Sequence, residues 1–447
     1  MSDPFDVVVI GAGPAGEHAT LRLHGQGRTV ALVERELIGG ECAYWGCIPS
    51  KTLLRSPETR AEARRAAGVQ EPAIRWPQLA EYRDYMIRGL DDSGEVARYG
   101  DRGVTVVKDC GRILEPGRVQ AGDRVLETER IVIATGSAAA VPEIEGLGEA
   151  GYWTNREATT LRELPDSVVV LGGGAVGIEL GQFLGRMGAT VTVVDGADRL
   201  LVREEPAVSE RAGRALADDG VEVLTGTRAE HVRTEDGRRV VSLQGGGEIR
   251  AQQLLVATGR CPRVHGIGLE ALGIEPDPEG IAVDERCRAA DGVWAIGDVT
   301  GVMPFTHVGK YQARIAAGDI AGDAVRADYS AIPRVVFSDP EIAAVGLTEQ
   351  RARERGIEIL TAQVELPDAI ARPYTYEQDP RGTLGLVADA ERQILIGAWA
   401  WAPLASEWIH YAALAIKAQL PLDVLRDTVA QFPTYTEAFL VGVGQLG

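Results

Sequence analysis

Two cysteines lie five residues apart in the stretch GGECAYWGCIPSK at residues 39–51. A bent helical turn could bring Cys42 and Cys47 together, so the pair could form a redox-active disulfide. Two buried thiols without chemistry are the alternative. Zinc is disfavoured because a structural zinc ion needs four ligands and no second Cys/His pair lies near in the sequence. We therefore expect no metal site. A thiol placed at a helix start should have a lowered pKa because of the helix dipole.

A glycine-rich turn follows an apolar run near the start of the chain. Residues 5–10 read FDVVVI, GAGPAG follows at 11–16, and a helical stretch then leads to an apolar run at 29–33 that ends in Glu34. In such a unit the first glycine permits a tight turn, the second lets the backbone approach a pyrophosphate, and the third allows close helix–strand packing. The pyrophosphate would meet the positive end of the helix dipole, and the carboxylate would accept hydrogen bonds from ribose.

The same order of features occurs a second time. Residues 167–171 form an apolar run, GGGAVG follows at 172–177, and a run at 190–194 ends in Asp195. The acid stands at the same offset from the first glycine in both units. One such motif is weak evidence, whereas two in strand context, each with a correctly spaced acid, indicate two dinucleotide sites. Two glycine-rich turns that bind nothing are the alternative.

Asp195 bears on which dinucleotide the second unit would bind. A carboxylate at this position can accept a hydrogen bond from a free 2′-hydroxyl and repels a 2′-phosphate. If the dinucleotide is a nicotinamide cofactor, we therefore expect a preference for NADH. Arg199 and Arg203 lie close downstream and could bind a phosphate, so NADPH stays an alternative.

Composition limits the class of protein. The chain has 447 residues, of which 45% are hydrophobic and 25% charged, which is ordinary for a globular protein of two to four domains. The net charge of −19 argues against nucleic acid and anionic membranes as partners. Five cysteines do not make an extracellular disulfide framework, and no basic segment of a secretory signal stands at the start. We expect a cytoplasmic protein with no membrane partner.

Local patterns divide the rest of the chain. Residues 55–98 look helical, and residues 103–134 and 221–256 alternate short strands with turns. An α+β region is expected from about residue 331. Its expected strands are 333–337, 358–365, 383–388 and 393–401, and its expected helices are 347–355, 405–418 and 434–441.

Taken together, these motifs resemble the flavoprotein disulfide reductase family, which includes dihydrolipoyl dehydrogenase, glutathione reductase and mercuric reductase. The resemblance covers essentially the whole chain. It rests on residues 11–16, 40–51 and 172–179, the Ala-Thr-Gly tripeptides at 134–136 and 257–259, AIGD at 295–298 and FSDPE at 337–341.

The resemblance implies an α/β fold with two Rossmann-like dinucleotide-binding domains, for FAD and NAD(P)H, and a C-terminal α+β dimerisation domain. The expected bounds are 1–150 and 271–330 for the two parts of the FAD domain, 151–270 for the NAD(P)H domain and 331–447 for the dimerisation or interface domain. A homodimer that acts on a small-molecule substrate is expected. In this family the dimerisation domain completes the active site of the partner subunit.

The resemblance also implies residue roles. Glu34 would bind the adenosine ribose of FAD, Asp298 the ribityl or pyrophosphate region, and the Thr306-His307 backbone would lie along the isoalloxazine ring. The other residues assigned to FAD are Gly11, Gly13, Pro14, Ala15, Gly16, Arg35, Gly40, Glu41, Cys42, Lys51, Gly111, Thr135, Gly136, Ser137 and Phe305. Those assigned to NAD(P)H are Gly172, Gly174, Ala175, Val176, Gly177, Glu179, Asp195, Ala229 and Gly259.

Four of the expected catalytic residues follow from the same resemblance. Cys47 would be the flavin-side sulfur and Cys42 the interchange thiol that meets the substrate. Lys51 and Glu179 match a Lys–Glu pair beside the flavin N5.

The chain departs from the family at the expected base. Most members carry His-Pro-Thr followed by a Glu that orients the His, whereas residues 432–437 read FPTYTE, with Phe432 at the base position and Glu437 retained. A phenylalanine cannot exchange a proton, and general acid–base help is worth roughly 10²–10⁴-fold. We therefore expect slow turnover of ordinary dithiol or disulfide substrates. Phe432 would also make the surroundings of the disulfide drier and raise the cost of an unpaired thiolate. Interface packing by Phe432, with a base supplied by Glu437 or by the substrate, is the alternative.

Two aromatic residues between the cysteines, Tyr44 and Trp45, are a second departure, because the family usually has smaller residues there. They could narrow the substrate side or stack on a ring. Packing against the flavin domain is the alternative.

Four functions compete. The first is an NADH-dependent reductase that passes electrons through FAD and Cys42–Cys47 to an unusual disulfide or other substrate. The second is a mercuric-reductase-like or 2-ketopropyl-coenzyme-M-reductase-like activity, since both groups resemble this chain in having Phe at the base position; the absence of a C-terminal cysteine pair counts against mercury. The third is a flavin-only quinone or dye reductase or transhydrogenase. The fourth is a flavin-bound structural dimer.

Overall fold

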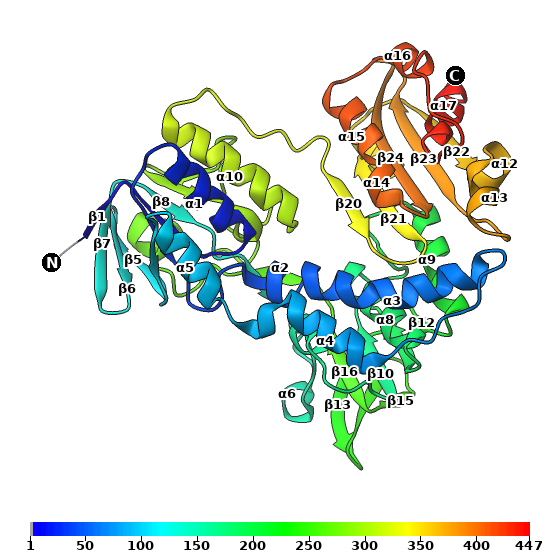
Figure 1. The fold of residues 1–447 in the computed structure, drawn as a ribbon, viewed down its shortest axis with the longest axis horizontal. Coiled ribbons are helices and arrows are strands. Elements are labelled where there is room, and N and C mark those ends of the chain that lie inside the picture. Colours follow the sequence, from blue (N-terminus) through cyan, green and yellow to red (C-terminus); the bar gives the residue numbers. More distant parts are fainter. Residues whose placement is uncertain (1–2) are drawn as a thin grey trace. The chain divides into compact units, whose positions relative to one another are not determined.

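The computed structural model describes residues 3–447, and contacts within the chain divide it into two units (Figure 1). The first unit comprises Met1–Ser50, Glu81–Ala140 and Gly259–Asp328, and the second comprises Lys51–Ala80, Val141–Thr258 and Tyr329–Gly447.

The first unit is built on a six-stranded sheet of order β18-β19-β8-β2-β3-β4. Its strands are β2 (Val7–Ile10), β3 (Val30–Val33), β4 (Thr105–Val107), β8 (Ile131–Ile133), β18 (Arg288–Ala290) and β19 (Val293–Ala295). All neighbours are parallel except β18 and β19. Strands β2 and β3 are buried at every position, because both faces of the sheet are covered.

The two faces of this sheet are covered differently. Helices α1 (Pro14–Gly25) and α10 (Thr306–Ala321) pack on the side of Val7 and Val9. On the side of Val8 and Ile10 the cover is a sheet of order β1-β7-β6-β5. Its strands are β1 (Asp3–Phe5), β5 (Gly111–Glu115), β6 (Arg118–Ala121) and β7 (Arg124–Thr128).

The second unit contains a parallel sheet of order β12-β11-β10-β16 and an antiparallel sheet of order β13-β14-β15. The strands are β10 (Ser167–Leu171), β11 (Thr190–Val194), β12 (Glu222–Leu224), β13 (Ala229–Glu235), β14 (Arg238–Leu243), β15 (Glu248–Ala251) and β16 (Gln253–Val256). Helices α8 (Ala175–Arg186) and α9 (Pro206–Asp218) pack on one face of the parallel sheet.

The same unit ends in a five-stranded antiparallel sheet of order β20-β21-β24-β23-β22. Its strands are β20 (Pro333–Val336), β21 (Glu341–Gly346), β22 (Ile359–Glu365), β23 (Thr383–Asp389) and β24 (Ile394–Ala402). Helices α15 (His410–Lys417) and α17 (Glu437–Gly444) cover one face, and Trp399 and Trp401 of β24 pack into the cluster that contains Phe183 of α8. This explains why β23 and β24 are buried at every position.

The α/β fold class with two Rossmann-like units is confirmed, and the paired strand–turn–helix elements lie where the sequence predicts them. Strand β21 was not predicted, because EIAAVG lacks the alternation of a half-buried strand and both of its faces are covered. The stretch 55–98, which was expected to be helical, is divided among three helices, α3 (Cys47–Arg65), α4 (Trp76–Met86) and α5 (Ser93–Asp101).

The units differ in extent from the four expected domain ranges, which stay a proposal. Residues 51–80 group with the second unit because Leu53 of α3 and Leu79 of α4 pack into the apolar cluster that contains Phe183. Among residues 3–447 no helix is long and apolar enough to cross a membrane.

Candidate functional site

The first glycine-rich turn joins β2 to α1 and holds its backbone very close to β8. Gly11 has a φ of +101°, and a Cβ on it would lie 2.3 Å from the carbonyl oxygen of Ala134. A Cβ on Gly16 would lie 1.9 Å from the carbonyl oxygen of Gly11. By contrast, a Cβ on Gly13 would meet nothing within 4 Å. The turn is therefore packed on one side and open at its middle glycine, which fits a pyrophosphate.

Helix α1 starts at Pro14 beside this opening, and its N-cap Gly13 has no side chain that could occupy the first N–H groups. Glu34 ends the next strand and is 8% exposed. Its carboxylate accepts hydrogen bonds from the N–H of Ala12 and the N–H of Glu36, both at 2.7 Å. Lone pairs remain for a ribose hydroxyl. The side chain of Arg35 is exposed.

Helix α2 (Gly40–Tyr44) is held against the same turn. The N–H of Gly39 donates to the carbonyl oxygen of Ala12 at 2.7 Å, and a Cβ on Gly40 would lie 2.8 Å from the Cα of Gly13. These contacts place Cys42, the third residue of α2, next to the dinucleotide turn.

Cys42 and Cys47 belong to two helices rather than to one bent turn. Helix α2 ends before Trp45, and α3 begins at Cys47. Both cysteines are thiols here, and the Sγ of Cys47 lies 3.5 Å from the Oγ1 of Thr306, the first residue of α10. Two sulfurs and one hydroxyl thus meet in the first unit.

The expectation that a helix start lowers the thiol pKa is wrong for Cys42. A hydrogen bond with the Cys47 thiol, burial and the Cys47 charge raise the pKa of Cys42 strongly, whereas Thr306 and Lys310 act to lower it. A helix of five residues has too few aligned peptide dipoles to outweigh a neighbouring thiol and the loss of water.

A polar network lies beside the start of α1 and includes Asp298. The Oγ of Ser137 donates to Asp298 Oδ2 at 2.6 Å, and Arg260 Nε donates to Ser137 Oγ at 2.6 Å. A Cβ on Gly297 would lie 3.0 Å from the Cβ of Ala15, so the Asp298 turn packs directly on α1. Arg260 was not predicted as a site residue, although it follows the second Ala-Thr-Gly directly.

The remaining residues expected around FAD belong to the first unit, except Lys51, which belongs to the second. Arg263 Nη2 lies 3.3 Å from Glu41 Oε1, and the Oγ1 of Thr135 donates to the Arg263 carbonyl at 2.8 Å. Gly136 has a φ of +71°. The rings of Phe305 and His307 stack at 5.2 Å, and Gly111 begins β5.

The second glycine-rich turn repeats the first. Gly172 has a φ of +112°, and a Cβ on Gly177 would lie 1.9 Å from its carbonyl oxygen, whereas Gly174 faces open space. Helix α8 begins at Ala175 and has no side-chain cap. Val176 follows in its first turn, and Ala229 and Gly259 lie at the start of β13 and before Arg260. The turn fits a second dinucleotide.

Asp195 is held rigidly at the end of β11. Its Oδ2 accepts from the N–H of Gly173 at 2.5 Å and its Oδ1 from the N–H of Ala197 at 2.8 Å. Arg199 donates to the Ser209 hydroxyl and to the carbonyl oxygens of Val202 and Glu204 at 2.9–3.0 Å. These hydrogen bonds therefore hold the Arg199 guanidinium within its own part of the chain.

Another cation, Arg228, lies closer to Asp195 than the sequence suggests. A Cβ on Gly196 would come within 2.9 Å of the Arg228 side chain, which is exposed. Arg228 was not predicted as a site residue because it is far from Asp195 in the sequence.

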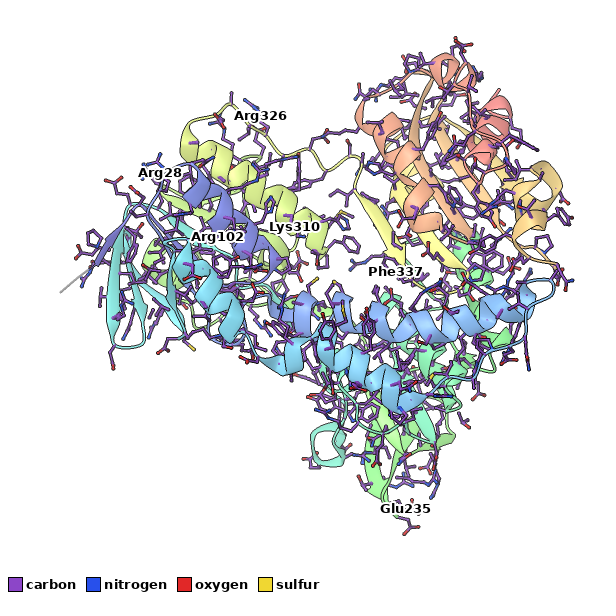
Figure 2. All side chains as sticks on the ribbon, viewed as in Figure 1. Arg28, Arg102, Glu235, Lys310, Arg326 and Phe337 are labelled. Carbon is purple, nitrogen blue, oxygen red and sulfur yellow. The ribbon has the colours of Figure 1, made fainter. Side chains whose placement is uncertain are left out.

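Lys51 and Glu179 are brought together as expected. Lys51 Nζ lies 2.6 Å from Glu179 Oε2, and Glu179 Oε1 accepts from the N–H of Phe337 at 2.9 Å. The Lys51 ammonium also lies 4.7 Å from the centre of the ring of Phe337. Phe337 is labelled in Figure 2. Phe337 was part of a recognised motif but was not expected to hold the pair.

The C-terminal candidates lie apart from these sites along the chain. Phe432 is 75% exposed. Glu437 Oε2 accepts from the N–H of Thr434 at 3.0 Å, so it stabilises the turn that carries Phe432. Tyr44 is fully buried and its hydroxyl accepts from Arg88 Nη1 at 3.1 Å, which favours the packing role for this residue.

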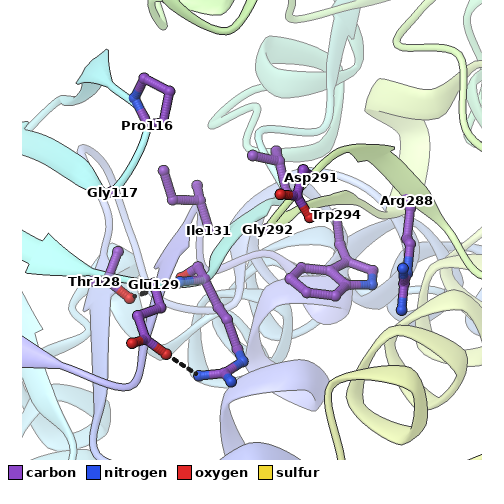
Figure 3. A pocket seen from close by; sticks show the side chains of 11 residues that line it. Pro116, Gly117, Thr128, Glu129, Ile131, Arg288, Asp291, Gly292 and Trp294 are labelled. Atoms are coloured by element: carbon purple, nitrogen blue, oxygen red, sulfur yellow. Dashed lines mark hydrogen bonds and ion pairs between the residues drawn. The ribbon is translucent and has the colours of Figure 1, made fainter. Parts of the chain in front are cut away.

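A surface hollow of about 540 Å³ in the first unit lies elsewhere (Figure 3). It is lined by the ends of β7, β8 and β19, and an ion pair of 3.3 Å joins Glu129 to Arg130 at its edge. The residues that line it do not include those expected to bind a dinucleotide.

Comparisons with known proteins agree across the chain. The family model described as pyridine nucleotide-disulphide oxidoreductase matches residues 5–313, and the model for the dimerisation domain of the same family matches residues 332–441. The mercuric reductase of Bacillus cereus is 32% identical over 98% of this chain and 71% of its own length. Dihydrolipoyl dehydrogenase 2 of Haloarcula marismortui is 32% identical over 97% of this chain and 94% of its own.

A solved structure is similar over the same span. The HOCl-induced flavoprotein disulfide reductase RclA from Escherichia coli superimposes with a TM-score of 0.88 and 27% identity, covering 99% of this chain and 100% of that one.

Proposed function

The chain belongs to the pyridine nucleotide-disulphide oxidoreductase family, and from this premise we propose that it passes electrons from NADH through FAD and the Cys42–Cys47 pair to a disulfide-type substrate, without a histidine base. The protein is an FAD-dependent enzyme with a pyridine nucleotide as electron donor, and it forms a homodimer through residues 332–441. The path through the thiols, NADH as the preferred donor and a cytoplasmic location are the parts that we propose.

FAD, when bound, supplies the redox step between the nicotinamide and the disulfide. The chain's own residues bind and orient it. The open N–H groups at the start of α1 would bind its pyrophosphate, and Glu34 would accept from its ribose. Asp298, oriented by the Ser137 hydroxyl, would bind the ribityl region. Lys51, fixed by Glu179, would donate toward the flavin ring.

The observation that carries the proposal is the meeting of Cys42, Cys47 and the Thr306 hydroxyl at the start of α10. The two thiols lie within hydrogen-bonding reach of each other, so they can exchange one S–S bond for two S–H groups with little movement of the backbone. A pair of inert buried thiols would need neither the Thr306 hydroxyl nor partial exposure to solvent.

Phe432 is part of the same proposal. Its exposure in one subunit makes it available to the other, where the family places its base. We propose that the partner's Phe432 closes the thiol site without exchanging a proton. This arrangement suits a substrate that brings its own proton or must be kept from water.

An anaerobic titration with NADH tests the proposal directly. We expect NADH to reduce the oxidised holoenzyme and to produce two free thiols. The free thiols are labelled with a thiol reagent, and mass spectrometry counts the labels. Cys42→Ser should abolish turnover of disulfides and spare NADH-dependent dye reduction. Cys261→Ser, at an exposed cysteine, is the matched control and should change neither activity.

If NADH bleaches the flavin while the thiol count stays constant, the thiols are outside the electron path. The flavin-only reduction of quinones or dyes, or hydride transfer between nucleotides, would then replace this proposal.

Reduction of a metal ion is a second candidate, because mercuric reductase is similar over 98% of this chain. A structure of the similar RclA is described as a Cu(II) complex. NADH oxidation with Hg²⁺ or Cu²⁺ as the acceptor, compared with a panel of disulfides and thioether ketones, separates the two candidates. A higher kcat/KM for the metal ion than for the disulfides and thioether ketones would favour reduction of a metal ion as the function.

A further inference from the structure

The chain that leads into α2, the helix that carries Cys42, is held by a buried carboxylate. Asp92 is 8% exposed, and its Oδ2 accepts a hydrogen bond of 2.7 Å from the N–H of Ile38, two residues before α2. The ammonium of Lys108 also contacts Asp92 Oδ2. Hydrogen bonds to an ionised carboxylate are among the stronger ones in proteins. Asp92 therefore fixes the point at which the chain enters α2.

The last residue of α2 is held by an arginine. Tyr44 is fully buried, and its hydroxyl accepts a hydrogen bond of 3.1 Å from Arg88 Nη1. Arg88 Nη2 in turn lies 3.2 Å from Oε1 of Glu95 in α5. The ring of Tyr44 packs against the start of its own helix, since a Cβ on Gly39 would lie 3.1 Å from Tyr44 Cε2. The Tyr44 side chain therefore anchors α2, and Arg88 holds this anchor.

Both contacts come from one short segment, residues 88–92, which we call the clamp segment. Arg88, Gly89 and Leu90 have positive φ angles of +53°, +59° and +63°. Two of these residues are not glycine, so their left-handed conformation is unfavourable and persists only because the surrounding structure enforces it. Strain of this kind is concentrated at functional sites. Here the strained turn brings Arg88 to the last residue of α2.

The anchor leaves the Cys42 thiol free. Cys42 stands two residues before Tyr44, and residues two apart on a helix do not face each other. The Tyr44 side chain is buried, whereas the Cys42 thiol is hydrogen-bonded to the Cys47 thiol. Cys47 is itself in contact with the Thr306 hydroxyl at 3.5 Å. The separation of the two sulfurs therefore depends on where α2 is held.

We propose that Arg88 is a positioning residue for the redox pair, which acts through Tyr44 and holds α2 so that Cys42 stays within bonding reach of Cys47; the inference rests on the proposed redox role of the two cysteines. When the pair is oxidised, two S–H bonds break, one S–S bond forms, and two electrons and two protons pass to the oxidant. Thiols that are held together react at a high effective concentration. The clamp segment therefore favours the disulfide over two separate thiols.

An equilibrium with dithiothreitol tests the proposal without NADH. Wild-type and Arg88→Met holoenzymes are equilibrated without oxygen in graded ratios of oxidised to reduced dithiothreitol, where oxidised dithiothreitol is the oxidant. Free thiols are trapped with N-ethylmaleimide, and mass spectrometry gives the fraction that carries a Cys42–Cys47 disulfide. Visible absorbance selects the samples in which the flavin stays oxidised. For Arg88→Met we expect the equilibrium constant for disulfide formation to fall about fivefold.

Two further variants make the result specific. Tyr44→Phe removes only the hydroxyl that accepts from Arg88, so it should lower the constant to a similar extent. The double variant should lower it no further, because the two side chains act as one unit. Arg98→Met is the matched control, since this exposed arginine contacts the same Glu95 but stacks on Tyr99. It should change the constant by less than about twofold.

The proposal is overturned if either Arg88→Met or Tyr44→Phe matches the wild-type constant, or if Arg98→Met lowers the constant as much as Arg88→Met. FAD content and Tm report folding separately. A variant that lowers Tm without changing the constant has a structural role only, which also overturns the proposal. If Arg88→Met does not fold, Tyr44→Phe decides the outcome.

Failure of the proposed function gives a different result. If NADH produces no free thiols, the path of electrons through the cysteines is removed. The equilibrium with dithiothreitol would still show whether Arg88 acts on the formation of the Cys42–Cys47 disulfide.

Discussion

Glu34 and Asp195 occupy equivalent places at the ends of β3 and β11, and each accepts a hydrogen bond from the glycine-rich turn beside it. The two carboxylates are thereby fixed before any nucleotide binds. Their rigidity is what allows a single residue to discriminate between ligands, because a mobile carboxylate could turn away from a phosphate.

At the residue scale, Asp195 should set the preference between nicotinamide cofactors. We expect kcat/KM for NADH to exceed that for NADPH by about tenfold or more, because like charges would be forced together. Asp195→Ser should lower the ratio of kcat/KM for NADH to kcat/KM for NADPH. Adding Arg228→Met to Asp195→Ser should remove the increase in kcat/KM for NADPH. Steady-state kinetics with both cofactors checks this. A wild-type preference for NADPH would contradict it.

The absence of a base is also a residue-scale feature. Phe432→His restores an imidazole at the position where the family uses one, and Glu437 is retained at the same turn. We expect turnover of simple dithiols or disulfides to rise by up to about 10²-fold with a new pH dependence near neutrality. The control Phe432→Leu should give no rise. If both variants behave alike, the shape of the pocket rather than the missing base limits turnover.

At the scale of elements, the last glycine of each turn decides how closely helix and strand can pack. Gly16→Ala would push a Cβ into the Gly11 carbonyl and should yield protein without FAD, whereas Gly177→Ala should keep FAD and lose NADH binding. The flavin spectrum and NADH binding isotherms separate the two. Gly94→Ala in α5, where a Cβ meets nothing within 4 Å, should change neither. Retention of FAD in Gly16→Ala would contradict the assignment.

A buried ion network joins α3 and α8 to the segment after β20. Arg65 donates to both carboxylate oxygens of Asp339 at 2.9 Å, and Arg186 Nη1 lies 2.9 Å from Asp339 Oδ2. Burial raises the pKa of Asp339, but Arg186 and Arg65 outweigh it and hold the pKa below its usual value. The stabilisation is therefore complete above the ordinary aspartate pKa and is lost as the pH falls through the lower, folded-state pKa.

Asp339→Asn should destabilise the protein near pH 7 by about 3 kcal/mol, because it removes one partner from buried charges. The difference in Tm from wild type should begin to narrow as the pH falls below about 4, where the unfolded chain binds the proton, and should vanish once the pH is below the lower pKa of the folded state. Thermal denaturation across this range measures both. The exposed Asp379→Asn should follow wild type at every pH. If the difference in Tm between wild type and Asp339→Asn stays constant down to the lowest pH, the charge of Asp339 is not the cause of the destabilisation.

At the scale of the whole molecule, the C-terminal region carries exposed apolar side chains that suit a subunit interface. Val429 is 92% exposed, Phe432 75% and Leu414 60%. Exposed apolar side chains gain stability when a partner subunit removes them from water. Their position in residues 332–441 agrees with the dimerisation domain that the chain contains.

Val429→Asp should weaken the dimer, because a carboxylate would be buried without a partner. We expect the dissociation constant to rise at least about tenfold, which corresponds to about 1.4 kcal/mol. Analytical ultracentrifugation over a concentration series measures it. Val69→Asp, at another exposed valine in the second unit, is the control and should leave the dimer intact. An unchanged dimer in Val429→Asp would place the interface elsewhere.

Much of the candidate site could be predicted from local sequence, and its binding and catalytic roles stay predictions. The glycines of both turns, the acids that end β3 and β11 and the cysteine pair could be assigned because each reflects a constraint within one short segment: a positive φ, a close backbone approach or the end of a strand. The resemblance to a known family then supplied the Lys51–Glu179 pair, whose members are 128 positions apart.

Tertiary structure decided what depends on contacts between distant segments. It brought the backbone N–H of Phe337 to Glu179, the guanidinium of Arg260 to Ser137 and the side chain of Arg228 to Gly196. It also placed the Thr306 hydroxyl of α10 against the Cys47 thiol. It also reversed the expected direction of the Cys42 pKa, because burial and a neighbouring thiol outweigh a short helix. Sequence periodicity reports which face of one element is buried, whereas the charge and polarity that a side chain meets are determined only when elements far apart in the chain pack together.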